Sequence, residues 1–155
     1  MSKLKYILPL FLALIISSCD QNCAYERYDT IENEKWDLAK TFTHEFDITD
    51  SMQWYNMYIN IRNTTDFRNS NLFLFVTTTF PKGQMAKDTL ECVLADPKGK
   101  WYGKGNDRFK DCKIMFKPKF RFSQTGKYKI NIQHAMREQV VVGISDIGIR
   151  LEKIK

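Results

Sequence analysis

The sequence lacks the signatures of the common enzyme classes. Its 155 residues contain no G-x-S-x-G nucleophile elbow, no H-E-x-x-H zinc motif and no P-loop. A C-x-x-C pair is also missing, and neither of the two histidines lies near a cysteine in the sequence, which argues against a zinc site. His44 and His134 fall on inward positions of predicted strands, where a hydrogen-bonded core histidine is expected. We therefore expect no enzymatic activity, no metal site and no cofactor.

A hydrophobic run long enough to span a membrane is absent as well. The apolar segment from Ile7 to Ile16 has ten residues, whereas a membrane-spanning helix needs about 20. Its length, and the lysines that precede it, are typical of a secretory signal. The sequence Ile16-Ser17-Ser18-Cys19 resembles a bacterial lipobox, so we expect residues 1–18 to be a lipoprotein signal peptide and Cys19 to carry covalent lipid. The alternative is an ordinary cleaved signal followed by an incidental cysteine.

The charge balance is basic, with 24 lysines and arginines against 18 acidic residues and a net charge of +6. Removal of Lys3 and Lys5 with the signal peptide leaves 22 basic against 18 acidic residues, a net charge of +4. An exported protein does not meet nucleic acid, so that class of partner is excluded. The expected partners are the membrane, through the N-terminal lipid, other envelope proteins and anionic glycans. The expected location is the cell envelope, at the outer membrane.

Three cysteines remain if Cys19 carries lipid. An odd number in an oxidising compartment leaves one thiol unpaired or bonded to another chain. We predict a disulfide between Cys92 and Cys112, because both lie within the body of the domain. The partner of Cys23 stays open.

Helical periodicity is nearly absent, and residues 135–142 are the only candidate helix. Alternating apolar and polar residues predict strands instead. The clearest of these cover residues 42–48, 55–61, 71–80, 88–95, 127–134 and 143–153. Roughly eight strands at this spacing predict an all-β fold, an antiparallel β-sandwich of the jelly-roll type. We expect residues 19–34 to be the lipidated N-terminus and a polar tether, and residues 35–155 to be the sandwich domain.

Positive charge is concentrated between Lys98 and Lys119, where eight basic residues meet two acidic ones. Aromatic residues are interleaved with them, a combination that suits stacking on sugars or docking on an acidic partner. The alternative is a solvated loop whose aromatic side chains pack inward. The candidate contact residues are Lys98, Lys100, Trp101, Tyr102, Lys104 and Arg108.

Three blocks of the sequence resemble the gliding-motility lipoprotein H family (GldH). They are RN…NLFLFVTTTFPKG at 62–83, DTLECVLADPKGKWYGKG at 88–105 and GKYKINIQHAMR…GISDIGIRLEK at 126–153. The resemblance implies an envelope lipoprotein associated with gliding motility and type IX secretion, without enzymatic activity. It implies a structural or assembly role through contacts with other gliding-machinery proteins. The second hypothesis is a glycan-binding lipoprotein that uses residues 98–119 as a basic aromatic loop.

Overall fold

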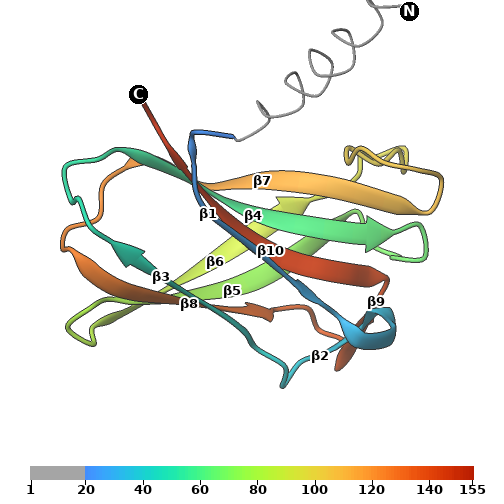
Figure 1. Cartoon of the computed structure of the whole chain (residues 1–155). Coiled ribbons are helices and arrows are strands. Elements are labelled where there is room, and N and C mark those ends of the chain that lie inside the picture. The colour runs from blue at the N-terminus through green and yellow to red at the C-terminus, as the bar shows by residue number, and fades with distance from the viewer. Residues whose placement is uncertain (1–19) are drawn as a thin grey trace, which may run out of the picture.

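The computed structural model describes residues 20–155, which form two packed antiparallel sheets (Figure 1). The larger strands, in chain order, are β1 (Cys23–Thr30), β3 (Phe42–Ile48), β4 (Tyr55–Thr64), β5 (Asn71–Thr79), β6 (Met85–Val93), β7 (Phe109–Phe120), β8 (Gly126–His134) and β10 (Ile144–Lys153). Two short strands, β2 (Lys35–Asp37) and β9 (Val140–Val142), pair with each other. The predicted all-β sandwich is therefore confirmed.

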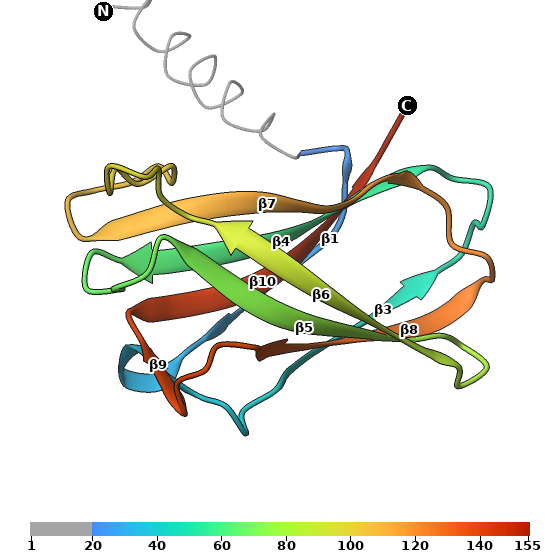
Figure 2. The same ribbon diagram turned by 180° about the vertical axis from the view of Figure 1, so that it is seen from behind.

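The strand order is that of a jelly roll. The first sheet has the order β1-β10-β4-β7 and the second has the order β3-β8-β5-β6. The view from behind shows β5 and β6 of the second sheet in front of the first sheet (Figure 2). Along the chain the antiparallel pairs are nested, with β5–β6 innermost, then β4–β7 and β3–β8, and β1–β10 outermost. This nesting is what results when one long hairpin is rolled into two layers.

Period-two alternation places one face of each sheet in a shared apolar core. In β3, every second residue from Phe42 to Ile48 is buried. The first sheet contributes Ile59 and Ile149, and the second contributes Leu74, all fully buried. Each such side chain stabilises the fold by about 1.5–3 kcal/mol through burial. The polar residues between them face outward, which fixes the register of both sheets.

The expected tether is wrong in part, because residues 23–30 form the edge strand β1. Its backbone pairs with β10 from Cys23 to Thr30. Tyr25 of this strand packs against the hydrophobic core, with its ring centroid 5.1 Å from that of Phe46. An edge strand with one inward aromatic side chain has little hydrophobic period, so the sequence pattern did not distinguish it from a linker.

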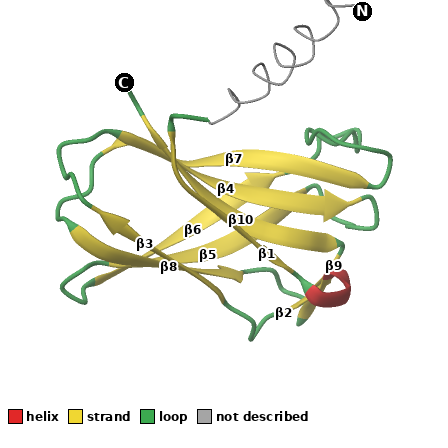
Figure 3. Cartoon of the chain, viewed as in Figure 1, coloured by secondary structure: helices red, strands yellow, loops and turns green. Residues whose placement is uncertain are grey.

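The expected helix at residues 135–142 is also wrong. Residues 140–142 form β9, which pairs with β2 around the fully buried Trp36. The described part of the chain has one helical element, the short 3-10 helix η2 (Glu32–Glu34), which follows β1 (Figure 3). None of the helices within residues 20–155 has the length and apolar content to cross a membrane.

The sandwich has two distinct ends. At one end lie the start of β1, the end of β10, the start of β4 and the end of β7, next to the C-terminus and to the first described residue, Asp20 (Figure 1). We call this the anchor end, because Asp20, the residue that follows the predicted lipidation site Cys19, lies there. The opposite end of the same sheet carries η2 and the connection from β6 to β7, and we call it the distal end. The ten residues of β10 separate the two ends by about 30 Å.

Candidate interaction site

The connection from β6 to β7, residues 94–108, is an ordered loop at the distal end. It begins with a four-residue turn, in which the Gly99 amide donates to the Asp96 carbonyl at 3.0 Å. The Asp96 carboxylate also accepts from the amides of Lys98 and Lys100, at 2.8 and 2.9 Å. Gly105 has φ +147°, and a Cβ there would lie 2.3 Å from the Phe109 carbonyl oxygen. Glycine is therefore required where the loop folds back onto β7.

The structure brings three of the predicted lysines to the surface of this loop. Lys98, Lys100 and Lys104 are exposed, and they form no ion pair with any residue in 20–155. Their charges are therefore free to meet an acidic surface. Tyr102 lies among them with 62% of its surface exposed.

The side chains of two other predicted contact residues make contacts within the sandwich. Trp101 is half-buried and packs against the core, with its ring 6.5 Å from that of Phe67. Arg108 makes a bidentate ion pair with Glu34, at 2.7 Å for each nitrogen–oxygen pair, and lies 3.4 Å from Asp66. Trp101 and Tyr102 thus do not form an exposed stacking platform, and Arg108 fastens the loop to η2.

The predicted basic loop 98–119 is half loop and half strand, since Phe109–Phe120 is β7. The strand was missed because lysines on its outer face hide the inward alternation of residues 112, 114 and 116. Two of these lysines are paired in the sandwich: Lys113 with Glu152 at 2.5 Å and Lys117 with Asp88 at 3.0 Å. Most of the lysines of residues 98–119 that lack an acidic partner in the described part of the chain therefore lie in the first third of this stretch, at Lys98, Lys100 and Lys104.

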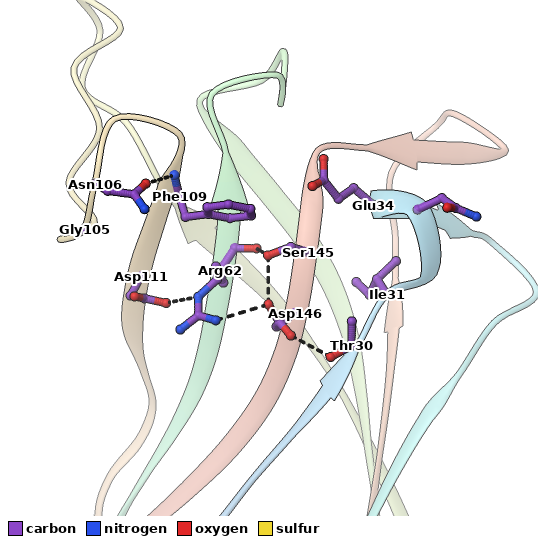
Figure 4. Close-up of a pocket in the computed structure, with 11 residues that line it drawn as sticks. Thr30, Ile31, Glu34, Arg62, Gly105, Asn106, Phe109, Asp111, Ser145 and Asp146 are labelled. Carbon is purple, nitrogen blue, oxygen red and sulfur yellow. Dashed lines mark hydrogen bonds and ion pairs between the residues drawn. The ribbon is translucent and has the colours of Figure 1, made fainter.

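A polar groove of about 600 Å³ opens beside the loop (Figure 4). Its floor is Arg62 of β4, whose Nε donates to Asp111 of β7 at 2.6 Å and whose Nη1 lies 3.6 Å from Asp146 of β10. Thr30 donates to the other oxygen of Asp146 at 2.9 Å. The Ser145 hydroxyl lies 2.8 Å from Asp146 and 3.2 Å from the Arg62 carbonyl oxygen.

The groove residues stabilise one another through these hydrogen bonds and ion pairs. The hydrogen bond to Asp111 raises the pKa of Arg62, which stays charged. The Ser145 hydroxyl has only acceptors next to it, with no histidine to take its proton. Sequence reasoning missed this groove because its residues are far apart in the chain. The one local signal was the polar Ser145-Asp146 pair that interrupts the apolar last strand.

The disulfide predicted between Cys92 and Cys112 is not formed in the structure, where both are free and buried thiols. Cys92 lies on β6 in one sheet and Cys112 on β7 in the other. The Cys112 sulfur is directed toward the Asn63 carboxamide oxygen, 3.9 Å away. Burial, and secondarily the neighbouring Cys112, raises the pKa of the Cys92 thiol to about 12, so the thiol is protonated. Cys23 in β1 forms no disulfide with a cysteine of the described part of the chain.

Both histidines are fully buried, as predicted, but within residues 20–155 no partner lies at standard hydrogen-bond geometry to their ring nitrogens. The Nε2 atom of His44 lies 3.5 Å from Asp29 Oδ2. Burial lowers the pKa of His44, and the Asp29 carboxylate partly offsets this effect. Burial also lowers the pKa of His134, whose ring packs edge-on against Trp36 at 5.5 Å.

Cys19 lies outside the described residues, so its lipidation stays a prediction. Within residues 20–155, no three histidine, cysteine, aspartate or glutamate side chains come together to hold a metal ion.

These features define a class of protein: a jelly-roll sandwich whose distal end presents exposed lysines that form no ion pair within residues 20–155. The model of the GldH lipoprotein family matches residues 23–151. The chain is 39% identical over 151 residues to the gliding motility lipoprotein GldH homolog of Christiangramia forsetii, covering 93% of this chain and 92% of that protein. It is 32% identical to the gliding motility lipoprotein GldH of Flavobacterium johnsoniae, covering 93% of each. The chain belongs to the GldH lipoprotein family.

Among solved structures, the insecticidal δ-endotoxin Cry8Ea1 of Bacillus thuringiensis gives a TM-score of 0.43 at 18% identity. The match covers 78% of this chain and 19% of the toxin.

Proposed function

We propose that this lipoprotein is a non-enzymatic assembly component of the cell envelope, anchored by lipid on Cys19 and bound to another envelope protein through its distal end. The outer membrane is the proposed location. Family membership supports a lipoprotein linked to gliding motility. The mutual hydrogen bonds of the groove residues support a contact surface in preference to a catalytic site.

The observation that carries the proposal is the placement of unpaired positive charge. Lys98, Lys100 and Lys104 lie with the exposed Tyr102 at the end of the first sheet opposite the anchored N-terminus. A surface about 30 Å from the anchor is positioned to meet another protein. Free lysines around an exposed aromatic ring suit a partner with an acidic patch, which would be steered by charge and held by the ring.

The glycan-binding alternative is not favoured by the geometry. Sugar stacking needs exposed aromatic faces, and Trp101 is packed against Phe67.

The test is affinity capture from solubilised envelopes, with mass-spectrometric identification of the captured proteins. The variant Lys98→Glu/Lys100→Glu/Lys104→Glu should recover the partner at least tenfold less well than the unmodified protein, because three attractions become repulsions. The matched control is Lys82→Glu/Lys127→Glu/Lys129→Glu, which reverses the same number of charges near the opposite end. Equal recovery of the partner by the two triple variants would show that Lys98, Lys100 and Lys104 do not contribute to binding.

A further inference from the structure

A second exposed patch lies at the anchor end and has no role in the proposed docking. It consists of Met52, Trp54, Lys119 and Arg121, and we call it the anchor-end patch. Met52 is 69% exposed and Trp54 is 39% exposed. The Arg121 guanidinium lies 4.6 Å from the centre of the Trp54 ring, and the Lys119 ammonium lies 5.9 Å from it. An exposed tryptophan flanked by cations is the combination that proteins place at membrane–water interfaces.

The patch is connected to the N-terminus by backbone hydrogen bonds. The Lys153 amide donates to the Asn22 carbonyl at 2.8 Å, and the Ile154 amide donates to the Trp54 carbonyl at 2.9 Å. Asp20, the first described residue, is ion-paired with Arg150 of β10. The residue that follows Cys19 is therefore fixed on the first sheet. The sheet order places β7, and with it Lys119, three strand spacings from β1, or about 14 Å.

The end of β7 is irregular in a way that directs these side chains outward. Its pairing with β4 is interrupted by register shifts between Tyr55 and Tyr58, where β7 carries extra residues. Lys119 has φ +39°, a conformation that non-glycine residues rarely adopt, and its amide donates to the Asn56 side chain at 2.8 Å. A bulge at a sheet edge commonly re-aims a side chain.

The cations of the patch are uncompensated. Neither Lys119 nor Arg121 forms an ion pair within residues 20–155. Asp50 is the acid of the neighbouring β3–β4 loop, and its carboxylate accepts the Met52 amide at 2.8 Å.

We propose that the anchor-end patch rests on the membrane that the lipid enters, with Trp54 and Met52 in the headgroup region and Lys119 and Arg121 on anionic headgroups. The proposal rests on the proposed lipidation of Cys19, which brings this end of the sandwich to the bilayer. Lipid and patch together provide two attachments about 14 Å apart. Two attachments fix the orientation of the sandwich and hold the distal end away from the membrane.

The test uses the full lipidated protein in vesicles of phosphatidylcholine with about one-third phosphatidylglycerol, with bromine atoms on the acyl chains near the headgroups. Flotation measures anchoring, and quenching of tryptophan fluorescence by bromine measures contact of the patch. We expect quenching in the unmodified protein and its loss in Trp54→Phe. The control Trp101→Phe removes a distal-end tryptophan and should retain the quenching.

Charge gives a second, independent arm. Each basic side chain at an anionic surface contributes about 1 kcal/mol, so Lys119→Gln/Arg121→Gln should lower the ratio of engaged to free domain roughly 30-fold. The control Lys98→Gln/Lys100→Gln should leave it unchanged. Vesicles that float with the protein but show no quenching, or quenching that survives Trp54→Phe, would overturn the proposal. Protein that does not float would instead contradict the lipid anchor.

Discussion

Arg150 is expected to be the most important single ion-pairing residue of the sandwich, and the substitution Arg150→Met tests this. Its side chain is only 13% exposed, and it contacts three carboxylates. The Glu26 carboxylate lies 2.7 Å away and the Glu152 carboxylate 2.5 Å away, while Asp20 pairs with it at the N-terminus. Methionine keeps most of the apolar stem but removes the cation that these acids share, and only Glu152 then keeps an ion pair within residues 20–155, with Lys113 at 2.5 Å.

The cost can be bounded from burial. Breaking a fully buried ion pair costs about 3–5 kcal/mol, whereas exposed pairs are worth about 0–1 kcal/mol. Arg150 and Glu152 are mostly buried, but Glu26 is 31% exposed and partly screened by solvent. We therefore expect a loss of about 2–3 kcal/mol in the free energy of unfolding. For a domain of this size that corresponds to a decrease of roughly 6–12 °C in Tm.

The assay is urea unfolding at pH 7, followed by circular dichroism. The matched control is Lys129→Met, which removes one partner of the exposed Lys129–Glu45 pair at 3.4 Å. This control should lose less than about 0.5 kcal/mol. If Arg150→Met is no more destabilising than Lys129→Met, then the network does not hold the N-terminus to the sheet as described.

Two further predictions concern buried groups. Burial lowers the pKa of His44 and His134, so below their ordinary pKa of about 6.5 the unfolded chain binds more protons than the folded chain. The free energy of unfolding should fall as the pH drops through 6.5, with a slope approaching about 1.4 kcal/mol per pH unit for each histidine. Urea titrations from pH 7.5 to 5.5 measure this slope. An equally steep slope in His44→Phe/His134→Phe would contradict the prediction. Because Cys92 and Cys112 are free and buried thiols, a thiol reagent should label them only after denaturation, and no reductant should be needed. If labelling of the denatured chain requires a reductant, the two cysteines form a disulfide.

Most of the strands could be predicted because one face of each is buried. Residues 42–48 are an example, since their alternation matches the burial of β3 residue by residue. In β1, edge position and polar composition leave no such pattern. The helix expected at residues 135–142 failed because three consecutive valines there pair with β2 instead. Local sequence does not show this tertiary pairing.

Of the candidate site, only the loop could be predicted from the sequence, and the groove could not. The composition of residues 98–104 showed the free lysines, but not that Trp101 packs inward. Arg62, Asp111 and Asp146 meet because β4 pairs with both β7 and β10. Their contact depends on a register that includes bulges, and a single sequence does not reveal it.

The most direct test of the central claim is site-specific photocrosslinking in living cells. A photoreactive phenylalanine analogue replaces Tyr102 at the distal end or, as a control, Met85, which is 73% exposed near the opposite end. We expect a crosslinked envelope protein from position 102 that is absent from position 85 and lost when Lys98, Lys100 and Lys104 are changed to glutamate. Crosslinks to the same protein from both positions, or only from position 85, would contradict a partner bound at the distal end.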